Sequence, residues 1–212
     1  MRDPYLLEGT SVLENLLGIR DADALQRAEA DITSIRLFTV DAAIQSADAG
    51  QQVPKAQAFG MSRLLAIHKH VFGDIYKWAG TIRTIPMEKG EMILGGDTIR
   101  YSLPDDIERD CATALGKLNG TKWGAAGVSE TALDFAMSIA ALWQVHPFRE
   151  GNTRTVVTFA TQFAEAHGFH MDKTLLKDRA AYVRDALVKA SDGQYSEYGH
   201  LAKIMEDAIR RG

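Results

Sequence analysis

Apolar residues recur at intervals of three and four along most of this chain of 212 residues. This spacing matches the 3.6-residue turn of an α-helix and differs from the two-residue alternation of a half-buried strand. The broadest stripe follows Ser129, a residue type that commonly caps a helix. Its apolar members are Ala132, Phe135, Ala136, Ile139, Ala140 and Trp143. The pattern predicts an all-α fold with this helix buried at its centre.

The same spacing predicts further helices at about 24–37, 56–72, 105–118, 152–167, 175–189 and 197–210. In the first of them, Leu25, Ala28, Ile32 and Ile35 form the apolar stripe. One stretch differs, because residues 81–87 and 92–94 are rich in β-prone side chains and are separated by Glu88, Lys89, Gly90 and Glu91. This arrangement predicts a short β-hairpin, which needs support from the helices because an isolated hairpin is marginally stable.

Charge and cysteine content exclude several classes of protein. The chain has 24 Lys and Arg against 28 Asp and Glu, a net charge of −4, so we expect neither a nucleic-acid partner nor an anionic membrane partner. A single cysteine, Cys111, cannot form an internal disulfide, which suits a reducing compartment. No apolar run is long enough for a membrane span, and the first residues lack the pattern of a signal peptide. We therefore expect a cytoplasmic protein, and later delivery into another cell stays open.

The nine residues from His146 to Arg154 carry the strongest chemical signal. They precede a predicted helix, whose first N–H groups and positive dipole suit phosphate oxygens. Gly151 allows close approach of the backbone, Asn152 tolerates unusual dihedral angles, and Arg154 adds a charged contact to phosphate. Glu150 is a hard oxygen ligand suited to Mg²⁺, and His146 titrates near neutral pH, as a general base must.

Each of these residues alone has an ordinary structural explanation. A histidine before a proline at a helix end is more often a cap or a packed core residue, and an isolated Gly-Asn is usually only a turn. Their joint occurrence in one short loop between two apolar helices favours an active site.

At these residues the chain resembles the Fic-domain family, whose motif is His-Pro-Phe-x-(Asp/Glu)-Gly-Asn-Gly-Arg-x-x-Arg. The positions that match are His146, Pro147, Phe148, Glu150, Gly151, Asn152 and Arg154. The stretch 67–84 resembles the family's helix that leads into its flap, and residues 9–15 resemble its common opening.

The resemblance implies a Fic fold as one domain over residues 1–212, with a core at about 56–190 and the N- and C-terminal helices packed on it. It makes the hairpin at about 83–101 a flap beside the active-site loop. It also implies Mg²⁺-dependent transfer of AMP from ATP to a Ser, Thr or Tyr hydroxyl of a target protein, which would dock on the flap by strand addition.

The resemblance also assigns roles to single residues. His146 would deprotonate the target hydroxyl, Glu150 would hold Mg²⁺, and Phe148 would anchor the loop in the core. The nucleotide-binding candidates are Gly151, Asn152, Thr153 and Arg154 in the loop and Lys89, Gly90 and Met92 in the flap.

Two positions depart from the motif, and both affect phosphate binding. Thr153 replaces a glycine, and Val157 replaces the second arginine. An arginine–phosphate contact that nothing replaces would cost on the order of 1.5–3 kcal/mol. Related Doc-type toxins have lysine at the Thr153 position and transfer the γ-phosphate. AMP transfer is our first hypothesis because Glu150 and the hairpin-like flap fit it. Transfer of the γ-phosphate is the second, a catalytically silent Fic-fold binding module is the third, and other nucleotide or phosphodiester donors of the family stay open.

Regulation has two candidate sources. Residues 10–15 fit the short pattern of the family's inhibitory helix, Ser/Thr-x-x-x-Glu-Gly/Asn. They also belong to the family's usual opening, and Val157 replaces the arginine that such a glutamate would engage. We therefore interpret this match as coincidence and expect any inhibition to come from a small antitoxin-like partner.

Overall fold

The computed structural model of the protein describes residues 3–51, 58–124 and 127–212. Its α-helices are α1 (Ala22–Gln51), α3 (Met61–Phe72), α4 (Ile107–Gly120), α5 (Val128–Val145), α6 (Asn152–Ala166), α7 (Lys173–Asp178), α8 (Ala180–Ala190) and α9 (Gly199–Arg211). The described residues also form three short 3₁₀ turns: η1 (Met92–Leu94), η2 (Pro104–Asp106) and η3 (Gly193–Tyr195). The all-α fold is confirmed. None of the described helices combines the length and apolar character that a membrane crossing requires.

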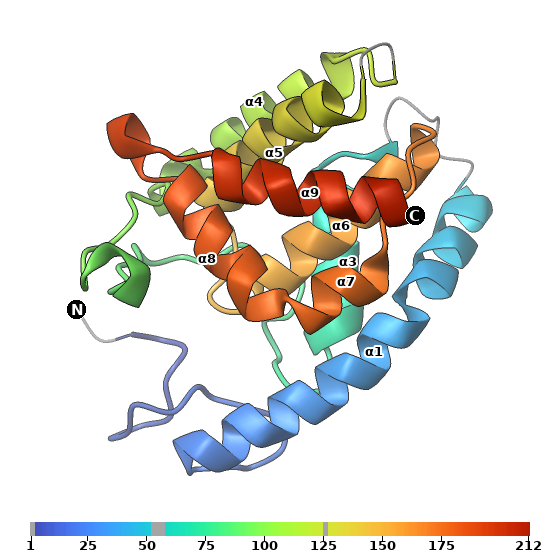
Figure 1. Ribbon diagram of the computed structural model, residues 1–212. Helices are drawn as coiled ribbons and strands as arrows, with labels where there is room; N and C mark the ends of the chain where they lie inside the picture. Colours follow the sequence, from blue (N-terminus) through green and yellow to red (C-terminus); the bar gives the residue numbers. More distant parts are fainter. Residues whose placement is uncertain (1–2, 52–57, 125–126) are drawn as a thin grey trace.

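Helix α5 lies at the centre of the bundle, as its broad apolar stripe predicts. It packs against α9 along its length and also contacts α4, α6 and α8 (Figure 1). Its buried side chains include Phe135, Ile139 and Trp143, which join one continuous apolar core that extends from α1 to α9. Gly127, and not Ser129, precedes its first turn, and the Ser129 hydroxyl instead donates to Glu206 of α9 at 2.7 Å.

Helix α1 is much longer than the stretch 24–37 suggests. It continues to Gln51, lies along one edge of the molecule and packs on α3 (Figure 1). Leu25, Val40 and Ile44 face the core, whereas Ile35, expected on the buried stripe, is 69% exposed. The later turns have few large apolar residues, so apolar spacing alone could not indicate where this helix ends.

Other helix boundaries differ by smaller amounts. The predicted start of α3 at about residue 56 lies outside the described residues. The helix expected at about 175–189 is divided into α7 and α8, which meet at Arg179. The Asp172 carboxylate caps α7 by accepting from the N–H groups of Thr174 and Leu175. No glycine or proline marks the break between α7 and α8, so the sequence carries no local signal for it.

The predicted β-hairpin is wrong in its strands. Within the segment 83–101, which we call the flap, one antiparallel bridge joins Gly90 to Thr98, and η1 forms the tip. Gly95 and Gly96 follow with φ of 69° and 99°, values that favour glycine. The chain does turn back on itself here, but η1 and the two glycines replace the pairing that a strand ladder needs.

Candidate active site

His146 ends helix α5 in the left-handed backbone region, with φ 53° and ψ 58°. Its N–H donates to the Trp143 carbonyl at 3.0 Å, and its ring stacks on Tyr101 with centroids 4.1 Å apart. The residue is only 3% exposed, yet neither ring nitrogen has a hydrogen-bond partner within the described parts of the chain. Left-handed backbone and unpaired buried polar atoms are both costly, and both are concentrated at functional sites.

The protonation state of His146 follows from its surroundings. Burial holds its pKa well below the ordinary value, and the positive charges of Lys89, Arg83 and Arg184 lower it further. The imidazole is therefore neutral at pH 7 and able to accept a proton. This matches the state that a general base requires.

The loop after His146 is held in shape by its own side chains. Phe148 is fully buried, and the Asn152 amide both accepts from its N–H at 2.9 Å and donates to its carbonyl at 2.8 Å. Gly151 has φ 82°, and a Cβ there would lie 2.2 Å from Phe72. The unusual dihedral angles expected at Asn152 thus belong to Gly151 and His146, while Asn152 is the first residue of α6 and closes the loop.

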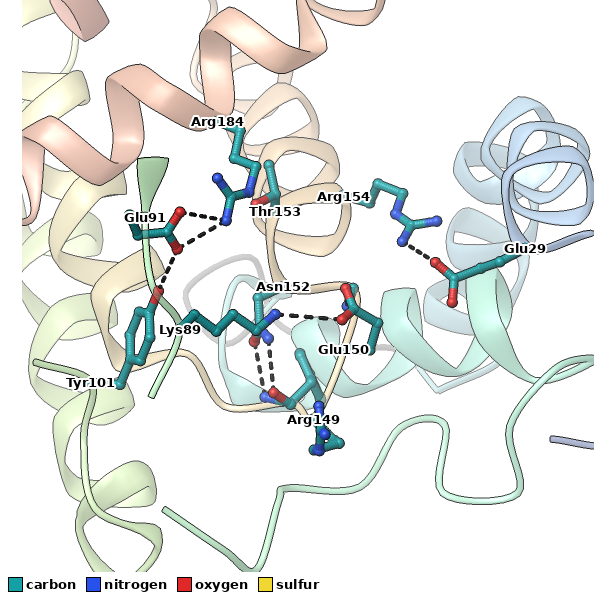
Figure 2. A network of polar contacts seen from close by, with 12 residues as sticks. Glu29, Lys89, Glu91, Tyr101, Arg149, Glu150, Asn152, Thr153, Arg154 and Arg184 are labelled. Atoms are coloured by element: carbon teal, nitrogen blue, oxygen red, sulfur yellow. Dashed lines mark hydrogen bonds and ion pairs between the residues drawn. The ribbon is translucent and has the colours of Figure 1, made fainter. Parts of the chain in front are cut away.

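Glu150 belongs to this loop, and Lys89 of the flap extends toward its carboxylate (Figure 2). Its carboxylate accepts from the Gly151 N–H at 2.9 Å and from Lys89 Nζ at 3.4 Å. Burial alone would raise its pKa, but Lys89, the Gly151 N–H and Arg154 together hold the pKa below the ordinary value. Glu150 is therefore an ionised oxygen ligand at neutral pH.

A metal ion at this site would need ligands other than protein side chains. Among the residues described, no three His, Cys, Asp or Glu side chains come together to form a metal cage. A single carboxylate nevertheless fits Mg²⁺, which usually keeps several waters and bridges one or two protein carboxylates to substrate phosphates. Glu150 is thus suited to hold Mg²⁺ together with a nucleotide.

The three nucleotide-binding candidates in the flap lie in different environments. Lys89 extends to Glu150, which brings the flap to the active-site loop (Figure 2). Gly90 forms the bridge to Thr98. Met92 is 91% exposed at the flap tip and does not join this cluster.

Thr153 and Arg154 point in different directions from the first turn of α6. The Thr153 hydroxyl accepts from Trp143 Nε1 at 3.0 Å. Arg154 extends toward α1, where it forms an ion pair with Glu29 and donates to the Thr33 hydroxyl at 2.9 Å (Figure 2). The motif suggests that Arg154 contacts a bound phosphate. For that contact, the Arg154 side chain would have to leave Glu29.

His68 is a supporting residue that the sequence did not single out for this role. The Gly80 N–H donates to His68 Nδ1 at 2.8 Å, which leaves the proton on Nε2, and Nε2 donates to the Glu150 carbonyl at 3.0 Å. The ring stacks on Phe148 with centroids 3.9 Å apart. Burial lowers the pKa of His68 to about 4; the hydrogen bond to the Glu150 carbonyl opposes this shift, and the positive charge of Arg154 adds to it. Its only sequence signal is its place in the helix of the 67–84 resemblance.

A buried carboxylate also joins the flap to α8, and the sequence did not point to it. Glu91 is buried, and it accepts hydrogen bonds from Arg184 at 2.9 Å and from the Tyr101 hydroxyl at 3.2 Å (Figure 2). Because Tyr101 in turn stacks on His146, this network extends from α8 to the candidate base. No local pattern could reveal a partner 93 positions away.

An apolar groove of about 940 Å³ adjoins the site between α1, α6, α7 and α8. It is lined by Thr153, Arg154 and Val157 on one side and by Ile35 and Phe38 on another. Phe38 is 92% exposed. Val157, which stands where the motif has its second arginine, thus gives this side of the site an apolar surface.

Three comparisons place the chain among known proteins. It is 33% identical over 209 residues to protein adenylyltransferase VbhT of Bartonella schoenbuchensis, a match that covers 99% of this chain but only 38% of VbhT. It is 28% identical over 195 residues to the probable protein adenylyltransferase y4lH of Sinorhizobium fredii, covering 91% of this chain and 90% of that protein. The crystal structure of BepC from Bartonella tribocorum with bound AMPPNP matches with a TM-score of 0.72 at 22% identity, over 96% of this chain and 95% of that one.

The structural match at this identity shows a common fold. A family model described as the Fic/DOC family matches residues 58–164, which include the whole loop from His146 to Arg154. That match covers half of the chain, and the chain therefore belongs to the Fic/DOC family.

Proposed function

We propose that this protein transfers AMP from ATP to a hydroxyl side chain of a target protein. The observation that carries the proposal is the neutral, buried His146, whose two ring nitrogens have no partner in the described structure, placed one short loop from an ionised Glu150 and the start of α6. The names of VbhT and y4lH, both adenylyltransferases, and the AMPPNP bound to BepC support this choice.

In the proposed reaction, each residue of the site has one role. His146 takes the proton of the target Ser, Thr or Tyr hydroxyl as its oxygen attacks the α-phosphorus of ATP. The new bond joins that oxygen to the α-phosphorus, and the bond to the β-phosphate oxygen breaks, which releases pyrophosphate. Mg²⁺ held by Glu150 would neutralise charge on the phosphates. The free N–H groups at the start of α6 would bind phosphate oxygens.

Thr153 fits this scheme in place of the usual glycine. Its hydroxyl oxygen accepts from Trp143, so its own proton remains available to donate to a phosphate oxygen. Its part in nucleotide binding is best tested with Thr153→Val, which keeps the volume and removes the hydroxyl. We expect weaker ATP binding, by roughly fivefold to tenfold, for the loss of about 1 kcal/mol.

The test of the reaction uses ATP labelled separately at the α- and γ-phosphates. The purified protein and a host-cell extract are incubated with each, and label on protein is measured for the wild type and His146→Ala. The exposed His200 provides the control variant, His200→Ala. We expect label from the α-phosphate only, lost in His146→Ala and retained in His200→Ala.

Other outcomes would favour the alternatives. Label from the γ-phosphate alone would refute AMP transfer and favour Doc-like phosphate transfer. No label from either position, together with no thermal stabilisation by ATP and Mg²⁺, would favour a silent binding module.

An inhibitory partner is part of the same proposal. The apolar groove beside Arg154 and Val157 would accept an apolar helix of a small antitoxin-like protein, in the helix-in-groove mode. Ser34 lines this groove, so a photo-crosslinker on Ser34→Cys should capture such a partner during purification from the host. The same crosslinker on the exposed Ser129→Cys serves as the control, and equal capture at both positions would refute a partner in the groove.

A further inference from the structure

Arg83 is fully buried at the start of the flap, with 1% of its surface exposed. Burial lowers the pKa of its guanidinium, which is the direction expected when a cation leaves water. Within the described ranges no carboxylate forms an ion pair with it. A buried charge is costly unless other groups compensate it, so its hydrogen bonds must supply the compensation.

Within the part of the chain that the structure describes, the Arg83 side chain makes three hydrogen bonds, all to backbone carbonyls. Nε donates to His146 at 2.8 Å, Nη1 donates to Ile85 at 2.6 Å, and Nη2 donates to Ser102. Its backbone N–H also donates to the Pro147 carbonyl at 2.9 Å. Arg83 therefore joins Ile85 in the flap and Ser102 just after it to His146 and Pro147 at the beginning of the active-site loop.

The contact to His146 is made at a strained residue. A histidine with φ 53° is held in a backbone region that L-residues avoid. Because its ring nitrogens make no hydrogen bonds within the described structure, the ring is placed by its backbone and by stacking on Tyr101. A group that fixes the His146 carbonyl thus also fixes the imidazole.

We propose that Arg83 is a positioning residue that holds His146 in its left-handed conformation and sets the flap at a fixed distance from it. The proposal rests on the function of His146 as general base. It gives this buried cation a role that no loop motif assigns, since Arg83 lies 63 positions from His146 in sequence.

The charge of Arg83 supplies a second, independent readout. The groups around His146 are Lys89, Arg83 and Arg184, all cations, and the neutral Tyr101 ring, whose hydroxyl bonds to Glu91. The Arg83 cation opposes protonation of the imidazole. A neutral residue in its place raises the pKa of His146, whereas lysine retains the charge but carries its donors on a single nitrogen, which cannot replace a planar guanidinium that reaches three carbonyls.

The experiment compares Arg83→Lys, Arg83→Ala and Arg109→Ala with the wild-type chain. Arg109 is an exposed arginine on α4 and serves as the control. Three quantities are measured: the titration of the His146 ring by NMR, hydrogen exchange of flap amides, and the kcat and KM for AMP transfer with α-labelled ATP. Millimolar guanidinium, far below denaturing concentrations, is then added to each protein.

For Arg83→Ala we expect the NMR titration of His146 to have a higher midpoint and the flap amides to exchange at least tenfold faster. The kcat for AMP transfer should fall more than tenfold, while the KM for ATP should change less than threefold. Guanidinium should restore part of the kcat in Arg83→Ala alone. Arg83→Lys should keep the His146 midpoint but show faster flap exchange, and it supplies the test if the alanine variant fails to fold.

A folded Arg83→Ala with wild-type titration and flap exchange would overturn the proposal. So would an Arg83→Lys protein identical to the wild type in flap exchange and kcat, because the three carbonyl contacts would then be unnecessary. If the wild-type chain transfers no AMP, the proposed function fails, while the titration and exchange data still decide whether Arg83 positions His146 and the flap.

Discussion

At the scale of single residues, the active-site loop depends on two left-handed backbone positions that have different side chains. Gly151 occupies one at φ 82°, where only glycine both adopts the conformation cheaply and leaves room for Phe72. His146 occupies the other at φ 53°, at an energetic cost of order 1–2 kcal/mol. That cost falls on the residue that we propose as the general base.

Gly151→Ala should lower the free energy of unfolding by about 2–5 kcal/mol, because the left-handed conformation and the overlap with Phe72 both act against it. Urea denaturation measures this change. Gly168→Ala is the matched control, since Gly168 has φ 83° with no atom within 4 Å of the added Cβ. For Gly168→Ala we expect the free energy of unfolding to fall by only about 1–2 kcal/mol. Equal losses at the two positions would show that the contact with Phe72 contributes nothing.

The depressed pKa of His146 predicts the pH dependence of the reaction. The kcat/KM for AMP transfer should stay on its plateau at pH 6.5 and fall only well below it, because burial and then the Lys89 charge oppose protonation. Lys89→Gln removes one cation, so the acid limb of the pH profile, where kcat/KM falls, should move to higher pH. Lys77→Gln, a change at an exposed lysine, should leave the limb in place. An unmoved limb in Lys89→Gln would contradict this electrostatic account.

At the scale of elements, the flap is held by side chains more than by backbone pairing. A single bridge and η1 leave most of its backbone without ladder partners, whereas Glu91 connects it to α8 through Arg184 and Lys89 connects it to the loop through Glu150. The flap is therefore fixed to the bundle at a few points, and its stability should respond to single side chains.

Arg184→Met should release the flap without unfolding the bundle. Arg184 is partly exposed in its ion pair with Glu91. Loss of this pair should therefore lower the free energy of local opening of the flap by about 1–2 kcal/mol. The amides of Glu91 and Gly96, bonded to Asp97 and Glu91 within the flap, should then exchange about tenfold faster. The exposed Arg179 gives the control, Arg179→Met. Unchanged exchange in Arg184→Met would mean that the ion pair does not hold the flap.

At the scale of the whole molecule, two buried neutral histidines connect stability to pH. His68 and His146 both have pKa values below the ordinary 6.5 in the folded protein, in each case chiefly because of burial. The unfolded chain gains a proton on each as pH falls through 6.5, but the folded chain does not. Unfolding is therefore favoured progressively below pH 6.5.

We expect the free energy of unfolding to fall from pH 6.5 to pH 5, with about 2 kcal/mol of the loss due to His68 alone, since its folded pKa is about 4. Urea denaturation at pH 7.5, 6.5 and 5 gives the slope. His68→Gln lowers stability at neutral pH but should reduce the slope below pH 6.5. Parallel curves for the variant and the wild type would disprove this linkage.

The sequence predicted some features well and others poorly for identifiable reasons. It placed α5 and the loop from His146 to Arg154 between two helices correctly, because their signals are contiguous in the chain. It missed the end of α1, where large apolar residues become sparse, and the break at Arg179, which has no glycine or proline. It predicted strands where η1 forms, because β-prone residues in an isolated short segment have no sheet to join.

The sequence by itself determined the helical class of the protein and the family motif from His146 to Arg154, since both depend on residues close together in the chain. Only the tertiary structure decided that Arg154 pairs with Glu29 and that Arg83 bonds to the His146 carbonyl. These partners are 125 and 63 positions apart. Spacing rules describe neighbours along one helix, whereas such pairs exist only after packing has brought separate elements together.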